Sequence, residues 1–109
     1  MLSIITGKVI RGDGYGRKIG FPTANLDVGS PKLPSAGVYG GKAIINRHTY
    51  RAGIIINDAG KVEAYLFGYR GDAYEKEMTL KLRNFIREFK KFDTEAELIT
   101  QIKKDLKQC

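Results

Sequence analysis

The stretch Met78-Thr79-Leu80-Lys81-Leu82-Arg83 alternates apolar with polar side chains, and this alternation indicates the fold class. Successive side chains of a β-strand point to opposite faces, so the pattern predicts a strand buried on one face only. Similar runs of β-branched and apolar residues lie between glycines and turn residues along most of the chain. Together they predict strands at residues 3–10, 38–46, 49–57, 62–67 and 78–86.

The connections between these strands are short. Residues 46–49 and the turn Asp58-Ala59-Gly60 are predicted hairpins, the second with residue types that tolerate positive φ. Short connections favour antiparallel neighbours, because parallel pairing needs crossovers of about a dozen residues. Five or six short strands in a chain of 109 residues close most economically into a barrel, which leaves no exposed edge.

The last part of the chain, residues 93–108, has a helical pattern. Thr94-Glu95-Ala96-Glu97 fits a capping box, in which the first and last side chains satisfy each other's backbone N–H groups. An apolar stripe at helical spacing follows, and we expect it to pack in the core: Leu98, Ile99, Ile102 and Leu106. The helix is therefore predicted to cap or flank the barrel. Cys109 is expected to be an inert thiol at its frayed end.

Composition places the chain among globular proteins, with 42% hydrophobic and 28% charged residues. Its length predicts one domain over residues 1–109. No uncharged apolar run approaches the roughly 20 residues that cross a bilayer, and the N-terminus lacks the basic-then-apolar order of a secretory signal. A single cysteine suits a reducing compartment. We expect a cytoplasmic monomer with no membrane partner.

The chain is basic, and its positive charge is clustered. There are 19 Lys and Arg against 12 Asp and Glu, a formal net charge of +7. Basic residues gather in segments 8–18 and 81–91. Such clusters suit a polyanion, either nucleic acid or the triphosphate of a nucleotide. The alternative is a solvated basic face that only aids solubility.

Residues 12–20 form a glycine-rich stretch, Gly12-Asp13-Gly14-Tyr15-Gly16-Arg17-Lys18-Ile19-Gly20. Glycine lets the backbone approach an anion closely and turn successive N–H groups toward it. The stretch is neither of two familiar nucleotide loops, because it lacks the Gly-Lys-Ser/Thr ending of a P-loop and the βαβ context of a Rossmann loop. An ordinary turn between strands is the alternative.

The next residues, Phe21-Pro22-Thr23-Ala24-Asn25, place a hydroxyl and an amide two positions apart. A hydroxyl beside bound phosphates is a suitable magnesium ligand, because Mg²⁺ prefers oxygen and keeps substrate phosphates in its coordination sphere. The alternative is a turn in which Thr23 and Asn25 bond only to the local backbone.

The whole segment Gly12–Leu26 resembles the signature of the ATP-dependent riboflavin kinases, which occur as standalone enzymes and as the C-terminal domain of bifunctional bacterial FAD synthetases. Further matches follow in order along nearly the whole chain: Leu33-Pro34, Gly37-Val38-Tyr39, Val62-Glu63-Ala64-Tyr65-Leu66, Ile86-Arg87-Glu88-Phe89-Lys90-Lys91-Phe92-Asp93, Leu98 and Gln101-Ile102-Lys103-Lys104-Asp105. The resemblance implies an all-β fold, a six-stranded antiparallel closed barrel of Greek-key topology with a C-terminal α-helix. It also implies that MgATP and riboflavin are converted to ADP and FMN.

The resemblance also assigns roles to single residues. Glu63 matches the catalytic base that takes the proton of the ribityl 5′-hydroxyl, Arg87 and Phe92 fall in the segment near the flavin, and Thr23 and Asn25 would hold Mg²⁺ or another divalent cation. The nucleotide would be bound by the loop and the residues after it: Gly12, Gly14, Gly16, Arg17, Lys18, Gly20, Thr23 and Asn25.

The residues around Glu63 agree in part with that role. Val62, Ala64 and Leu66 should share one face of their strand, which leaves Glu63 with Tyr65 and Phe67 on the other. The alternative is a surface glutamate paired across strands with Lys81 or Arg83, a contact worth under about 1 kcal/mol. His48, in a predicted hairpin, is expected to be an ordinary surface residue.

One departure from the family pattern concerns residues 54–61. Family members commonly carry an Asn-Ile-Gly…Pro-Thr stretch there, and this chain has only Ile54-Ile55-Ile56-Asn57-Asp58-Ala59-Gly60-Lys61. The shortened segment motivates one alternative, a flavin- or nucleotide-binding module without catalysis. The net charge and the 11 Tyr and Phe residues motivate another, a barrel that binds single-stranded nucleic acid. The main prediction is a kinase with small-molecule substrates and no nucleic-acid partner.

Overall fold

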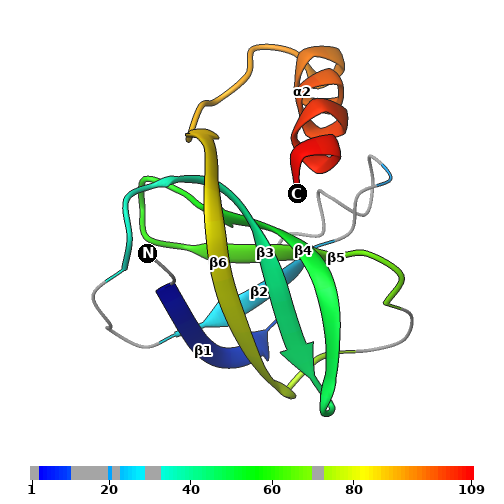
Figure 1. Ribbon diagram of the computed structural model, residues 1–109. Coiled ribbons are helices and arrows are strands. Elements are labelled where there is room, and N and C mark those ends of the chain that lie inside the picture. Colours follow the sequence, from blue (N-terminus) through cyan, green and yellow to red (C-terminus); the bar gives the residue numbers. More distant parts are fainter. Residues whose placement is uncertain (1–2, 11–19, 21–22, 29–32, 70–72) are drawn as a thin grey trace.

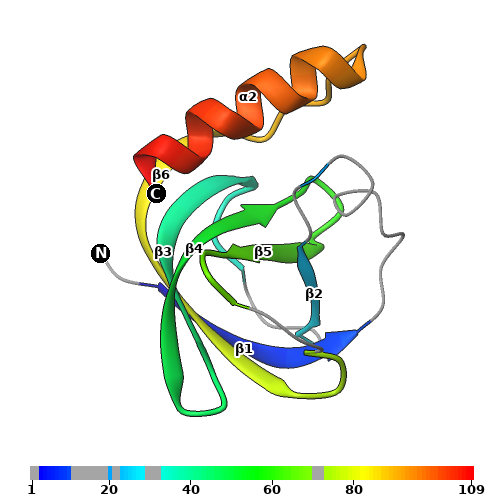
Figure 2. The same cartoon turned by 90° about the vertical axis from the view of Figure 1, so that its right-hand side faces the viewer.

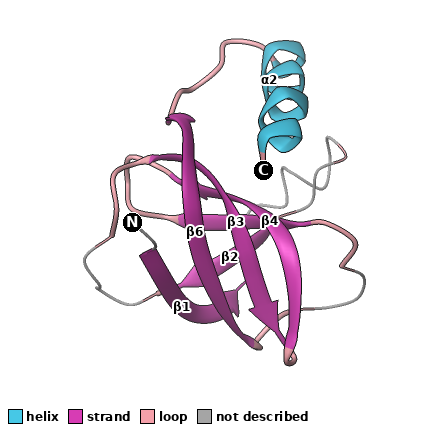
Figure 3. Ribbon diagram, in the orientation of Figure 1, coloured by secondary structure: helices cyan, strands magenta, loops and turns pink. Residues whose placement is uncertain are grey.

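The computed structural model describes residues 3–10, 20, 23–28, 33–69 and 73–109 of the chain. Within them lie six strands and one helix, coloured along the sequence in Figure 1 and by type in Figure 3. The strands are β1 (Ser3–Ile10), β2 (Ala24–Asp27), β3 (Gly37–Ile45), β4 (His48–Ile56), β5 (Val62–Leu66) and β6 (Glu77–Glu88), and the helix is α2 (Glu95–Gln108).

The six strands form a closed barrel in the order β1-β2-β5-β4-β3-β6. Every pairing is antiparallel, and β1 closes the barrel against β6. Strands β3, β4 and β5 follow one another, while β2 returns to lie beside β5, which is the Greek-key arrangement. The expected fold class, a six-stranded antiparallel barrel with a C-terminal helix, is therefore confirmed.

Inward-facing side chains of all six strands fill the barrel. The alternation expected around Met78 is present, since Met78, Leu80 and Leu82 are buried while Thr79 and Lys81 are only half-buried. Burial of one such aliphatic side chain contributes about 1.5–3 kcal/mol. The core cluster consists of Ile5, Val9, Leu26, Tyr39, Ala43, Ile45, Ala52, Ile54, Ile56, Val62, Ala64, Met78, Leu80 and Leu82.

Both expected hairpin turns are present. Asn46 and Arg47 connect β3 to β4 with φ of 52° and 66°, the pair of positive values that suits a tight hairpin. In the β4–β5 turn the side-chain oxygen of Asn57 accepts hydrogen bonds from the backbone N–H of Ala59 and of Lys61, both at 2.9 Å. Gly60 has φ of 78° there. The shortened segment is thus a compact turn that satisfies its own backbone.

Helix α2 lies outside the barrel, across the ends of β3 and β4 (Figure 2). The hydroxyl of Thr94 accepts a hydrogen bond of 3.2 Å from the Glu97 N–H, as the capping box predicts. The apolar stripe differs from expectation, because Leu98, Ile99, Ile102 and Leu106 are all half-buried and none belongs to the barrel core. The barrel is already filled by its own strands, so the helix packs on its outer surface.

Two further details differ from the sequence prediction. Ala24–Asp27 is a strand, β2, where only a turn or a metal-binding stretch was expected. Cys109 does not fray, because its N–H donates to the Leu106 carbonyl and its thiol donates to the Asp105 carbonyl at 3.3 Å. The thiol is half-buried near Gly53, where an added Cβ would lie 3.2 Å from the sulfur.

The pairing of β3 with β6 predicts an intolerant position at Gly41. A Cβ there would overlap the carbonyl oxygen of Lys81, beside a register shift between Gly40 and Gly41. Gly41→Ala should lower the free energy of unfolding, measured by chemical denaturation, by about 3 kcal/mol. Gly68→Ala is the control, because a Cβ at Gly68 meets nothing within 4 Å and costs only its positive φ of 80°, about 1 kcal/mol. An equal loss in both variants would contradict the packing described here.

Candidate active site

One row of paired residues crosses the outer face of the barrel. Asn25 of β2 is opposite Glu63 of β5, Glu63 is opposite Ile55 of β4, Ile55 is opposite Val38 of β3, and Val38 is opposite Arg87 of β6. Directly paired residues of an antiparallel sheet point to the same face. The register therefore gathers residues distant in sequence on one surface, the surface that α2 covers.

The acidic group of this row has a defined partner. The Thr23 hydroxyl donates a hydrogen bond of 2.8 Å to Oε1 of Glu63. Thr23 stands two residues before Asn25 and so belongs to the same face of the chain. Strand β5 has β2 and β4 as neighbours, not β6, so the alternative pairing of Glu63 with Lys81 or Arg83 is wrong.

A cavity of about 540 Å³ lies between this face and α2. Its floor includes Val38, Gly53 and Ile55, and its roof is the half-buried stripe of the helix, Leu98, Ile102 and Leu106. Thr23, Glu63 and Tyr65 line it from the β2–β5 side, while Arg87, Phe89 and Phe92 line it from the end of β6 and the segment that follows. The stripe thus forms one wall of a binding cavity, which explains why it stays only half-buried.

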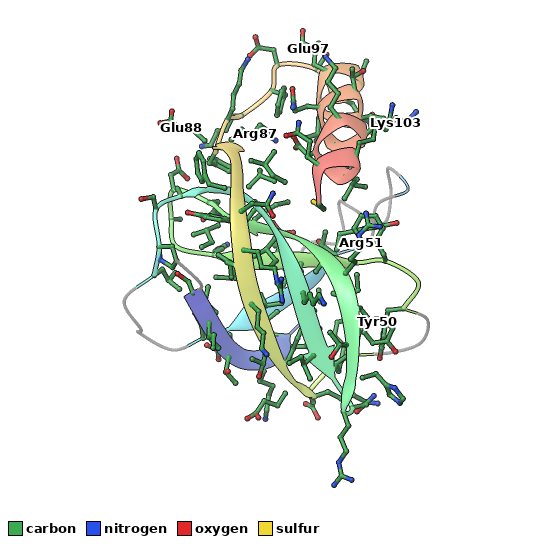
Figure 4. All side chains as sticks on the ribbon, in the orientation of Figure 1. Tyr50, Arg51, Arg87, Glu88, Glu97 and Lys103 are labelled. Atoms are coloured by element: carbon green, nitrogen blue, oxygen red, sulfur yellow. The ribbon has the colours of Figure 1, made fainter. Side chains whose placement is uncertain are left out.

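Arg87 forms an ion pair between barrel and helix, and Figure 4 shows it at the end of β6 toward α2. Its Nε donates to both carboxylate oxygens of Asp105 at 3.0 Å, and its Nη2 donates to Oδ2 at 2.8 Å. Asp105 is 5% exposed. The Arg87 guanidinium carbon also lies 5.5 Å from the centre of the Phe92 ring.

Asp105 and Gln101 were not singled out by the sequence analysis, although the sequence contains a signal. Asp105 is three residues after Ile102 and seven after Leu98, so it falls on the apolar stripe of α2. A carboxylate on such a face is almost never buried without a partner. That partner is Arg87, together with the Gln101 amide, which donates to Oδ1 of Asp105 at 2.9 Å.

Four of the expected site residues, Thr23, Glu63, Arg87 and Phe92, therefore line one cavity. Asn25 lies beside Glu63 in register. Gly20 is described and has φ of 89°. The other residues assigned to the nucleotide loop, Gly12, Gly14, Gly16, Arg17 and Lys18, lie outside the described residues. Of the shortened segment, residues 54–61, only Ile55 lines the cavity.

The donor atoms around Glu63 suit a hard divalent cation. The Thr23 hydroxyl, the Asn25 amide and the Glu63 carboxylate offer oxygen, which Mg²⁺ prefers. Within the described ranges no group of three or more His, Cys, Asp and Glu residues could hold a metal ion. A cation that also binds phosphate oxygens and water needs only one or two ligands from a protein.

Comparisons with known proteins show the family of the chain. A family model described as Flavokinase: Riboflavin kinase matches residues 3–109. The chain belongs to the riboflavin kinase family. The chain is 36% identical over 114 residues to the RNA-binding riboflavin kinase RibR of Bacillus subtilis, covering 96% of this chain and 49% of that protein.

Two further relatives belong to the same family. The bifunctional riboflavin kinase/FMN adenylyltransferase of Listeria monocytogenes is 38% identical over 108 residues, covering 91% of this chain and 34% of that protein. The crystal structure of riboflavin kinase from Trypanosoma brucei superposes with a TM-score of 0.70 at 25% identity, covering 97% of this chain and 73% of that one. The chain thus spans a third to a half of the length of the two curated relatives.

The reactivity of Cys109, the single cysteine of the chain, shows whether α2 is docked on the barrel. Burial, and next the nearby Asp105 carboxylate, raise the pKa of the Cys109 thiol, although Arg51 acts in the opposite direction. Because the thiolate is the reactive form, Cys109 should react with a thiol reagent roughly tenfold or more slowly in the folded protein than in denaturant. Equal rates in the two states would contradict the docking of α2 against β3 and β4.

Proposed function

We propose that this chain is a riboflavin kinase that transfers the γ-phosphate of MgATP to the ribityl 5′-hydroxyl of riboflavin. The observation that carries the proposal is the Thr23–Glu63 pair at the wall of the cavity beneath α2. A cavity of about 540 Å³ with mostly apolar walls and few polar groups is typical of a small-molecule site. The family membership supplies the substrate class.

The two walls of the cavity suit a flat aromatic ligand. Aliphatic side chains of α2 face aliphatic side chains of β3 and β4 across it, and Phe89 and Phe92 lie at one end. The isoalloxazine ring would lie between these walls, with Arg87 and Phe92 beside it, and the ribityl chain would extend toward Glu63. The nucleotide would approach from the side of Thr23 and Asn25, which the sequence connects directly to the glycine-rich loop.

The proposed chemistry is an in-line phosphoryl transfer. The ribityl 5′-oxygen forms a bond to the γ-phosphorus, the bond from that phosphorus to the β–γ bridging oxygen breaks, and ADP leaves. Glu63 takes the proton of the 5′-hydroxyl. Oε1 of Glu63 accepts from Thr23, and Oε2 has no partner among the residues described. The Thr23 hydrogen bond thus orients the carboxylate and leaves one oxygen for the proton.

Thr23 and Asn25 are the residues that would hold the divalent cation of MgATP. When bound, the cation neutralises charge on the phosphates. The positioning of both substrates on one rigid barrel face provides the rest of the rate enhancement, because phosphoryl transfer depends mainly on alignment and electrostatic stabilisation.

The partners proposed are riboflavin and ATP alone, bound by a monomer. The name of the Bacillus subtilis relative includes RNA binding, which does not agree with the expectation of no nucleic-acid partner, but that name describes a protein of which this chain matches 49%.

No helix in the described part of the chain is long and apolar enough to span a membrane.

Glu63→Gln tests the base. The variant keeps the size of the side chain and its hydrogen bond from Thr23 but cannot take up the proton, so kcat for FMN formation should fall by about 10²–10⁴. Riboflavin affinity, measured by quenching of flavin fluorescence, should stay near that of the wild type. Glu97→Gln is the matched control, because this exposed glutamate of α2 does not line the cavity. Wild-type turnover in Glu63→Gln would contradict the assignment of Glu63 as the catalytic base.

Thr23→Val tests the hydroxyl. The replacement keeps the shape of the side chain, so we expect a higher KM for MgATP, little change in riboflavin affinity, and recovery in Thr23→Ser. An unchanged KM for MgATP would contradict the role of Thr23.

The reaction itself separates the proposed function from its alternatives. Protein incubated with riboflavin, ATP and Mg²⁺ should form FMN, resolved by chromatography, and chelation of Mg²⁺ should abolish the product. Saturable quenching of riboflavin fluorescence without FMN would instead identify a non-catalytic binding module. Absence of both signals would overturn any flavin function, and salt-sensitive binding to single-stranded oligonucleotides would then be measured.

A further inference from the structure

We infer that Asp105, the buried carboxylate of helix α2, is a positioning residue for riboflavin: through Arg87 it sets how α2 stands over the barrel and where the Arg87 guanidinium points into the cavity. This inference rests on the function proposed above. It concerns a residue that lies outside the Thr23–Glu63 pair and on the opposite side of the cavity.

The attachment of α2 to the barrel is concentrated near the C-terminal end of the helix. There Gly40 and Gly53 let the chain approach closely, since a Cβ at Gly40 would lie 3.0 Å from the Cα of Cys109 and one at Gly53 would lie 3.2 Å from Leu106. The Asn84 amide also donates to the Gln108 carbonyl at 3.4 Å. Leu98 and Ile102, farther toward the N-terminus of α2, line the cavity together with Leu106.

Asp105 belongs to this C-terminal part of α2, one residue before Leu106. Its pairing with Arg87 uses two donor nitrogens of a planar group against one carboxylate, which fixes orientation as well as distance. A small rotation of α2 about its anchored end would change the height of the cavity roof. The Arg87–Asp105 pair opposes that rotation, because any tilt of the helix breaks the planar alignment.

Asp105 also fixes the direction of Arg87. The guanidinium has five N–H groups. Those used are Nε–H and one on Nη2, both toward Asp105, and one on Nη1, which donates to the Glu88 carbonyl at 3.0 Å. One N–H on each terminal nitrogen is left for a ligand in the cavity that Arg87 lines. With the carboxylate in place these donors point in one direction only.

We expect the pair to have only a small net effect on stability, which favours a positioning role. Both side chains are largely withdrawn from water, with side-chain exposures of 23% for Arg87 and 7% for Asp105. Desolvation of such a pair offsets much of its attraction, and replacement by apolar residues of similar size is often neutral for stability. An apolar pair does not reproduce the fixed orientation of the side chain at position 87 and of α2.

The first experiment compares steady-state kinetics of three proteins with the wild type: Asp105→Asn, the apolar double variant Arg87→Met/Asp105→Leu, and the control Lys103→Ala. Lys103 is an exposed residue of the same helix, labelled in Figure 4. We expect kcat/KM for riboflavin to fall roughly tenfold or more in Asp105→Asn and in the double variant. The KM for MgATP should stay unchanged, and the control should equal the wild type.

The double variant tests stability alone, because it removes the Arg87 donors together with Asp105, and its stability should be near that of the wild type. Asp105→Asn tests positioning, because it keeps Arg87. If Asp105 only stabilised the fold, kcat/KM for riboflavin would be that of the wild type wherever this variant is folded, whereas positioning predicts a lower value. Wild-type riboflavin kinetics in Asp105→Asn would overturn the inference.

The second experiment uses Cys109 and does not depend on activity. The Asp105 carboxylate raises the pKa of the Cys109 thiol. Removal of the Arg87 cation leaves that negative charge in place and uncompensated, so electrostatics alone predicts no faster reaction with a thiol reagent in Arg87→Met. Loss of helix position predicts faster reaction. We expect the faster reaction, with slow hydrogen exchange retained in the core strands as evidence that the barrel is folded.

The two experiments test the proposed kinase activity and the inference about Asp105 separately. A wild-type protein that forms no FMN would overturn the proposed kinase, and the thiol experiment would still report on the helix. A slower or unchanged thiol reaction in Arg87→Met with a folded barrel would overturn the inference about Asp105 and leave the kinase untouched.

Discussion

The candidate site depends on one constraint, the strand register that places Asn25, Glu63, Ile55, Val38 and Arg87 in a single row across the barrel. A shift of one residue in any of these strands would turn its member of the row into the core. The core opposes such a shift, because Val62, Ala64, Ile54 and Ile56 fill the interior from the same strands. Packing of the barrel core therefore keeps the residues of this row on the outer face.

Helix α2 converts that row from an exposed surface into a cavity. Contact with the barrel buries the apolar stripe of α2 only in part. A space of about 540 Å³ with aliphatic walls on both sides therefore remains between helix and barrel. The polar groups lie at two places, Thr23 with Glu63 and Arg87 with Asp105. An apolar slot with a carboxylate at one side and a guanidinium at another suits a ligand with a flat ring and a polar tail.

Much of this arrangement follows from the sequence. Runs of β-branched and apolar residues between glycines and turn residues, with period-2 alternation at 78–83, located five of the six strands to within about two residues. The capping box located the start of the helix. Strand β2 was missed because four residues that follow a proline carry too little periodicity to show a strand. The stripe of α2 was expected in the core, because helical spacing shows which face is apolar but not whether that face meets a packed surface or a cavity. The partners of Glu63 and Asp105 depend on strand order and on contacts across 40 and 18 residues, which no local pattern contains.

The most direct test of the account is a crystal structure of the protein with riboflavin, Mg²⁺ and a non-hydrolysable ATP analogue. The account predicts the isoalloxazine ring between the α2 stripe and the outer face of β3 and β4, with the ribityl 5′-oxygen about 3 Å from the Glu63 carboxylate. A flavin bound elsewhere, for example in the open cleft beside Tyr39 and Phe85, would contradict it. So would a flavin in the cavity with its ribityl chain directed away from Glu63.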